Sequence, residues 1–365
     1  MKFFCYSIDF ADAVSKVSKA LPIKKINPIL EGIKISAQEN ILTIFASDLE
    51  FSIEIKINAE VLIEGVSVVN GRVLADFVRK LGSESIEVFS TETNMTIGYS
   101  ENKVVLQCLR TEEYPPFVFL NDEGDVTVKG KDYKDIIEKV IFCTSNEDNR
   151  PILKGCSLEI RENEMRAVAL NGYRLGFAQS ESVITSKDTD IIIPARALHE
   201  ITRLIGDEDI VSIKTQRSFL QMNFSNTSVL ARLIEGKFID YRKIIPLDFG
   251  IEVTANKKQL EEAIERAVVI MRDEKVDVIR MEISENILII TTKSELGNIK
   301  ESITVNKKGN DINIGFNAKY IIDSLKAIEG DFVRLKMIES TKPCVIEPIE
   351  NKNCLYLVLP LKILN

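Results

Sequence analysis

The residues of this chain that could carry enzyme chemistry do not form a recognised catalytic pattern. The stretch from Gly124 to Asp132 comes nearest to a phosphate-binding loop, but it has five residues between its glycines where the motif has four. It also ends in Asp132, where the motif needs Ser or Thr to bind magnesium. We therefore expect no nucleotide site at this stretch.

The histidine and the cysteines offer little for metal or redox chemistry. The one histidine, His199, falls within a predicted helix, so a two-histidine metal site cannot form, and we expect an exposed or half-buried helix residue. The cysteines are scattered without any CxxC pair, and we expect reduced, apolar packing residues. They are Cys5, Cys108, Cys143, Cys156, Cys344 and Cys354. We predict no catalytic residue, metal or cofactor.

Length and composition indicate a globular protein of several domains. The 365 residues exceed what one hydrophobic core usually organises, and the hydrophobic content is 45%. No uninterrupted apolar run approaches the roughly 20 residues of a membrane span. The first ten residues, MKFFCYSIDF, lack the apolar segment of a signal peptide. We expect a cytoplasmic protein without a membrane partner.

Two sequence patterns recur at a distance of 123 residues. The pentapeptide PILEG at 28–32 returns as PILKG at 151–155. The pairs Glu39-Asn40, Glu162-Asn163 and Glu285-Asn286 are separated by the same distance. Alternating apolar residues flank each pair, which predicts a β-hairpin with Asn supplying the turn. The chain therefore consists of three copies of one unit.

Each copy contains two helices and several short strands. The predicted helices cover residues 7–22, 72–81, 129–145, 195–205, 255–275 and 318–328. A strand precedes each helix and three strands follow it, so six βαβββ half-units fill the chain. The fold class is α+β, with three repeated domains of two half-units each. Proline- and glycine-containing linkers at 114–125 and 245–252 place the domains at 1–121, 122–249 and 250–365.

The charge distribution favours a polyanionic partner despite the net charge of −8. The predicted helices together carry net positive charge, whereas the rest of the chain is strongly acidic. This asymmetry indicates a shared helix face turned toward DNA, although any single basic residue could equally lie on a solvated face. The candidates for DNA contact are Lys24, Arg72, Arg79, Arg196, Arg203 and Lys319.

Several short stretches, in their order and spacing, resemble the bacterial sliding clamp family, the β subunit of the replicative DNA polymerase. They are Asn27-Pro28-Ile29-Leu30, Ser47-Asp48-Leu49-Glu50, Asn171-Gly172-Tyr173-Arg174-Leu175, Phe238-Ile239-Asp240-Tyr241-Arg242 and Leu357-Val358-Leu359-Pro360-Leu361. The resemblance covers essentially the whole chain. It implies a DNA-clamp fold, in which a head-to-tail homodimer forms a ring with helices inside and antiparallel sheets outside. It also implies an accessory subunit rather than an enzyme.

The resemblance further implies a groove that receives a short peptide from partner proteins. Its positions are Leu153, Leu170, Gly172, Tyr173, Arg174, Leu175, Ile239, Lys243, Ile244, Leu357, Val358, Leu359, Pro360 and Leu361. Leu170, Ile239 and Lys243 depart from the residues that are frequent in the family, so we expect a more apolar groove. Expected partners are double-stranded DNA, the replicative polymerase α subunit, the clamp loader, and other DNA polymerases and repair proteins.

The same resemblance assigns residues to DNA and to the dimer seam. Arg150 is a further candidate for phosphate contact, without the aromatic residues that follow it in some members. Val104 and Leu106 of one protomer are expected against Ile270 and Met271 of the other. The chain ends with two residues, Leu364 and Asn365, that extend beyond the family's usual end.

Three hypotheses remain open from sequence alone. The first is a ring-shaped processivity factor. The second is a nucleotide-dependent enzyme with an unfamiliar site, which added nucleotide would stabilise against melting. The third is a three-domain scaffold that binds proteins without encircling DNA, which would be a monomer at micromolar concentration.

Overall fold

The computed structural model describes residues 1–24, 27–115, 125–147, 149–216, 218–271 and 277–362. Most of the predicted linker at 114–125 lies outside the described residues, as do the end of the predicted helix at 255–275 and the terminal Leu364 and Asn365. Within the described ranges, the six predicted βαβββ half-units are confirmed, with two additional short strands, β5 (Glu60–Ile63) and β14 (Val183–Thr185).

The first domain contains two of these half-units. Its elements are β1 (Lys2–Tyr6), α1 (Ser7–Val17), β2 (Gly32–Gln38), β3 (Ile41–Ser47), β4 (Phe51–Asn58), β6 (Gly65–Asn70), α2 (Gly71–Val78), β7 (Ser85–Ser90), β8 (Asn94–Tyr99) and β9 (Asn102–Leu109). The first strand of each half-unit pairs with the other half, β1 with β7 and β6 with β2. These ladders join the two half-units into one domain.

The other two domains repeat this order. The middle domain contains β10 (Val126–Lys129), α3 (Gly130–Glu138), β11 (Gly155–Arg161), β12 (Glu164–Leu170), β13 (Arg174–Ser180), β15 (Thr189–Pro194), α4 (Ala195–Leu204), β16 (Ile210–Gln216), β17 (Phe219–Phe224) and β18 (Thr227–Arg232). The third domain contains β19 (Ile251–Asn256), α5 (Lys257–Val269), β20 (Val278–Ser284), β21 (Ile287–Ser294), β22 (Gly297–Lys308), β23 (Ile312–Asn317), α6 (Ala318–Ala327), β24 (Phe332–Met337), β25 (Cys344–Pro348) and β26 (Cys354–Val358).

Asparagine caps begin three of the helices. The Oδ1 atoms of Asn70, Asn256 and Asn317 accept hydrogen bonds from backbone N–H groups in the first turns of α2, α5 and α6. Such caps satisfy donors that lack a partner within the helix. The helices are shorter than predicted, since α1 passes into a 3₁₀ turn at Ser18–Ala20 and α3 ends at Glu138.

The hairpins predicted at the three Glu-Asn pairs form, and glutamate contributes to the turn that the prediction assigned to asparagine. Glutamate takes the left-handed conformation in each, with φ of 49° at Glu39, 50° at Glu162 and 48° at Glu285. Asn40 shares this conformation, with φ of 62°. Two of the asparagines also bond a neighbouring strand: Asn40 Oδ1 accepts from the Val61 N–H, and Asn286 Oδ1 from the Lys307 N–H. The recurrence of that bond supports the repeat.

The chain divides into two compact units, and the middle domain contributes to both. Unit 1 contains Met1–Lys131, Ile184–Lys187 and His199–Leu233; unit 2 contains Asp132–Val183, Asp188–Leu198 and Ile234–Asn365. In unit 1 a ladder between β18 and β4 joins strands of the middle and first domains. In unit 2 a ladder between β13 and β26 joins strands of the middle and third domains.

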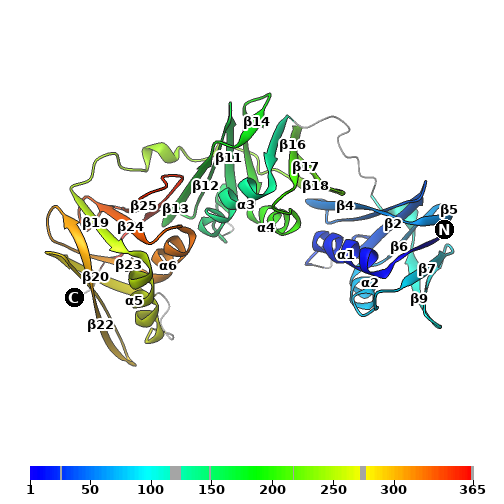
Figure 1. Ribbon diagram of the computed structural model, residues 1–365, viewed down its shortest axis with the longest axis horizontal. Coiled ribbons are helices and arrows are strands. Elements are labelled where there is room, and N and C mark those ends of the chain that lie inside the picture. Colours follow the sequence, from blue (N-terminus) through cyan, green and yellow to red (C-terminus); the bar gives the residue numbers. More distant parts are fainter. Residues whose placement is uncertain (25–26, 116–124, 148, 217, 272–276, 363–365) are drawn as a thin grey trace. The chain divides into compact units, whose positions relative to one another are not determined.

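Each unit has paired helices packed against an antiparallel sheet. In unit 1, α1 packs against α2 and lies over β3 and β4; in unit 2, α5 packs against α6 and lies over β19, β21 and β22 (Figure 1). The strand order in unit 2 is β15-β11-β12-β13-β26-β25-β24-β19-β22-β21-β20-β23. This continuous sheet positions the candidate site.

Candidate functional site

The two segments predicted to border a groove lie side by side in unit 2. Strands β13 and β26 pair antiparallel, with Arg174 opposite Val358 and Leu175 opposite Leu357. The contact continues beyond the strand, because the Leu359 N–H donates to the Tyr173 carbonyl at 2.9 Å. Two residues further on, the Leu361 N–H donates to the Gly315 carbonyl at 2.8 Å.

A tight turn before β13 presents Tyr173 at the surface. Asn171 Oδ1 accepts hydrogen bonds from the backbone N–H groups of Tyr173 and Arg174, both at 3.0 Å. Gly172 has φ of +91°, a conformation that side-chain-bearing residues rarely adopt. The turn leaves the Tyr173 side chain 54% exposed. This aromatic residue is therefore available to a partner.

The predicted groove residues separate into a buried support and an exposed rim. Leu153, Leu170, Leu175 and Leu357 are at most 5% exposed and belong to one core cluster, and Val358 is fully buried. The exposed or half-buried members form the rim; they are Gly172, Tyr173, Ile239, Lys243, Ile244, Leu359, Pro360 and Leu361. Lys243 pairs with Asp240 at 3.1 Å. The sequence prediction did not include Tyr241, which is 3% exposed within the same cluster.

Arg174 does not lie on the rim, in contrast to its predicted place in the groove. Its side chain is 8% exposed, and Nη1 bonds Asp323 of α6 at 2.6 Å while Nη2 donates to the Phe142 carbonyl. The guanidinium lies 4.5 Å from the Tyr320 ring centroid and 5.1 Å from that of Phe142. Arg174 thus joins the middle domain to the third. The i, i+3 spacing of Tyr320 and Asp323 on a predicted helix is a signal that sequence reasoning missed.

The candidate DNA-contacting residues are all exposed. Unit 1 holds Lys24, Arg72, Arg79 and Arg203, and unit 2 holds Arg150, Arg196 and Lys319. Arg72 donates to the Pro22 carbonyl at 2.9 Å, and Arg79 lies 3.7 Å from Asp76. These are weak surface contacts, and a phosphate could replace them at small cost.

Other cations on the third-domain helices are engaged by carboxylates. Lys326 of α6 pairs with Glu265 of α5 at 2.8 Å, and Arg266 makes two hydrogen bonds to Glu301 of β22. The pKa of Glu301 is lowered by those hydrogen bonds. Lys319 of α6 is exposed and forms no ion pair among the described residues.

The predicted seam residues differ in accessibility. Val104 and Leu106 on β9 and Ile270, which follows α5, are half-buried. Met271 is 2% exposed, and its sulfur lies 2.9 Å from the Thr292 hydroxyl in its own domain. Met271 is therefore a core residue in this chain, because the C-terminal end of α5 turns it inward.

The histidine and most of the cysteines have plain structural environments. His199 is exposed on α4, as predicted. The six cysteines are free, and burial raises the pKa of Cys143, Cys156 and Cys344 to about 12, which suppresses the reactive thiolate. Cys108 is only half-buried. The described residues contain no group of three or more potential metal ligands, and none of their helices could cross a membrane.

We predict that Arg174→Met lowers the free energy of unfolding by about 1–3 kcal/mol, since it leaves Asp323 without its cation. That range is reduced from the value for a fully buried pair because the Asp323 side chain is 25% exposed. Chemical denaturation followed by circular dichroism measures the change. Arg79→Met, which removes an exposed pair, should cost under about 0.5 kcal/mol. Equal losses in the two variants would contradict a specific role for Arg174.

Comparisons with known proteins agree over the length of the chain. Models of the DNA polymerase III beta subunit match in succession: the N-terminal domain over residues 1–119, the central domain over 127–240 and the C-terminal domain over 242–362. The beta sliding clamp of Staphylococcus epidermidis is 29% identical over 367 residues, covering 97% of each chain.

Solved structures give the same result. A putative DNA polymerase III beta subunit from Eubacterium rectale is 28% identical with a TM-score of 0.95, and the beta subunit from Thermotoga maritima is 26% identical with a TM-score of 0.93. Both alignments cover 100% of each chain. Three matched domains in order and a fold shared from end to end lead to one conclusion: this chain belongs to the bacterial sliding clamp family, the beta subunits of DNA polymerase III.

Proposed function

We propose that this protein is a processivity clamp that encircles double-stranded DNA as a head-to-tail homodimer and tethers DNA polymerases through a peptide groove. Family membership supports this function, and so does the structure of the strand edges. We also propose the domain boundaries 1–121, 122–249 and 250–365, and a role as a non-catalytic accessory subunit.

The observation that carries the proposal is a free strand edge in each unit. Strand β9 pairs with β8 along residues 102–107 but with β6 only at Cys108 and Leu109. Strand β22 pairs with β21 along residues 297–304 but with β19 only from Val305 onward. Among the described residues, each strand therefore has a stretch whose outer backbone groups lack a strand partner, which a second protomer could pair.

Weak contacts to DNA suffice for a closed ring. A ring is retained by topology, so exposed lysine and arginine side chains need only make sequence-independent phosphate contacts that permit sliding. Net acidity elsewhere does not oppose this, because charges beyond about 10 Å are screened at physiological salt. The exposed candidates on α2, α4 and α6 fit such transient contacts.

The rim around Tyr173 fits a short peptide with an apolar anchor. Tyr173, Ile239 and Ile244 are between 37% and 54% exposed above a closely packed core. Aromatic and aliphatic side chains on a rigid support are the usual anchors of a peptide interface. We propose as partners the polymerase α subunit, the clamp loader, other DNA polymerases and repair proteins.

For the seam, we predict that Ile270→Asp converts the dimer to a monomer, because the charge would have to be buried at the joint. Met271 is left unchanged because its substitution would damage the domain core. Sedimentation velocity at micromolar concentration measures the state. Ile184→Asp, at a position 74% exposed, is the control and should remain dimeric. A dimeric Ile270→Asp protein would show that the seam lies elsewhere.

For the DNA surface, replacing Arg72, Arg196 and Lys319 with Glu should weaken retention on DNA. The slope of log affinity against log salt should fall by about 1 for each phosphate that the variant no longer neutralises. The control carries the same change in net charge at exposed sites on strands and loops: Lys56, Lys308 and Lys352 to Glu. An identical slope in the two triple variants would place α2, α4 and α6 away from DNA.

For the groove, deleting residues 361–365 should abolish binding of a peptide that carries a polymerase clamp-binding motif. Strand β26 ends at Val358, so the deletion leaves every strand ladder intact and removes the Leu361–Gly315 backbone bond together with the half-buried Leu361 side chain. Tyr173→Ala should weaken binding by about 1–3 kcal/mol. Fluorescence anisotropy measures the affinities, with Tyr6→Ala, 70% exposed in unit 1, as control. Unchanged affinity in folded, dimeric deletion protein would remove the groove from this site.

A further inference from the structure

The rim segment at residues 236–245 depends on side chains for its position. It carries Ile239 and Ile244, yet its regular structure is one 3₁₀ turn, Tyr241–Lys243. The backbone N–H groups of residues 243–245 bond to the carbonyls of Asp240 and Tyr241, within the same segment. These bonds shape the turn but do not attach it to the sheet below. Side-chain contacts must make that attachment.

Tyr241 supplies the buried apolar part of the attachment, and Phe238 and Ile245 of the same segment pack against the same cluster. Its ring packs into the core cluster beneath the rim and lies 5.8 Å from the Phe177 ring. Its hydroxyl lies 3.4 Å from Glu159 Oε2 on β11. Burial, together with the nearby Glu159 charge, raises the pKa of Tyr241 to about 12, so the hydroxyl stays protonated and donates to the carboxylate.

Arg242 supplies the polar part of the attachment. Glu159 accepts hydrogen bonds from both Tyr241 and Arg242. The guanidinium stacks 4.5 Å from the Tyr241 ring centroid and donates to both Glu159 oxygens, at 2.5 and 3.4 Å. Glu159 is only 17% exposed. Its strand is paired on both sides, with Arg166 and Asp190 as its neighbours, so the carboxylate projects from a rigid part of the sheet. Bidentate arginine–carboxylate pairs fix orientation as well as distance.

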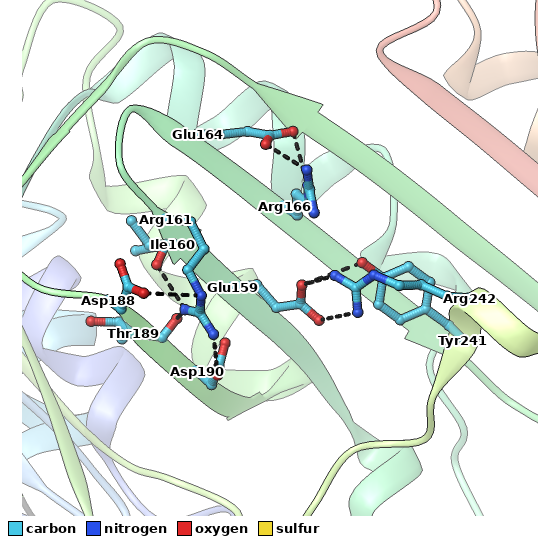
Figure 2. Close-up of polar contacts among 10 residues, drawn as sticks. All are labelled: Glu159, Ile160, Arg161, Glu164, Arg166, Asp188, Thr189, Asp190, Tyr241 and Arg242. Carbon is cyan, nitrogen blue, oxygen red and sulfur yellow. Dashed lines mark hydrogen bonds and ion pairs between the residues drawn. The ribbon is translucent and has the colours of Figure 1, made fainter.

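Among the arginines drawn on this sheet face, Arg242 is the one that is hydrogen-bonded to Glu159. Figure 2 shows three separate groups on this face: Arg166 turned to Glu164, Arg161 turned to Asp188 and Asp190, and Arg242 turned to Glu159. Arg166 makes two hydrogen bonds to Glu164, at 2.6 and 2.8 Å. Glu164, Asp188 and Asp190 are therefore engaged by other arginines, and loss of Glu159 would leave Arg242 with only the electrostatic attraction of Asp240, without the two hydrogen bonds.

We propose that Glu159 is a positioning residue for partner binding: it holds Tyr241 and Arg242, and through them the rim residues Ile239 and Ile244. Glu159 need not touch the peptide. Its effect is to keep the rim in the bound geometry before the peptide arrives, which lowers the ordering cost of binding. The inference rests on the proposed peptide groove.

The test measures the affinity of a fluorescein-labelled peptide bearing a polymerase clamp-binding motif for the full-length dimer. Glu159→Gln should weaken binding by about three- to tenfold, which is less than the full loss of a charge-assisted hydrogen bond because the Arg242 side chain is 54% exposed and can be solvated. Glu164→Gln breaks the neighbouring Arg166 pair on the same sheet face and should leave the affinity unchanged. Melting curves, recorded for every variant, set the assay temperature well below the transitions.

A double-mutant cycle separates positioning from general destabilisation. If Glu159 acts mainly through Arg242, then Glu159→Gln should cause a smaller loss in an Arg242→Gln background than alone, because only the Tyr241 hydroxyl contact is then left to lose. The inference would be overturned if the fold-loss of peptide affinity in the double variant equalled the product of the two single losses. It would also be overturned if Glu159→Gln and Glu164→Gln bound the peptide equally well. Neither outcome would refute the proposed groove. Failure of the unmodified dimer to bind the peptide would instead refute the proposed groove itself, and the inference with it.

Discussion

The pairing of β13 with β26 is the interaction on which the candidate site depends. It brings residues 170–175 of the middle domain beside residues 357–361, nearly two hundred positions away. The ladder satisfies the backbone of both strands and places Leu175 and Leu357 in one core cluster. Arg174 reinforces the same joint from the helix side through Asp323. The rim rests on this joint between two domains.

Ion pairing differs between the sheet surface, where it stabilises the fold, and the helix surface that we propose binds DNA. On the sheet around β11, arginines are engaged by carboxylates, as in the Arg166–Glu164 and Arg242–Glu159 pairs. On α2 and α6, Arg72 and Lys319 are exposed and have no ion-pair partner among the described residues. The acidic composition is thus compatible with a proposed DNA surface, since binding depends on where unengaged cations lie rather than on their sum.

Sequence periodicity predicted most of the fold, because each repeat imposes the same alternation and the same helices. It could not predict details that depend on partners far away in the chain. Sequence alone places Arg174 at the groove surface, but its contacts with Asp323 and Tyr320 bury it. It likewise places Met271 at an accessible seam, but the end of α5 turns this side chain toward Thr292. Glu159 has no local sequence signature, since its partner Arg242 lies 83 positions later in the chain.

Topological retention on DNA is the central claim, and one measurement tests it most directly. The protein is loaded by a bacterial clamp loader onto nicked circular duplex DNA, isolated with the circle by gel filtration, and the DNA is then cut once. An encircling dimer should stay on the circle through repeated filtration at moderate salt and leave from the ends after linearisation. Equal retention on circular and linear DNA would contradict encirclement and favour direct binding by a scaffold that does not enclose the duplex.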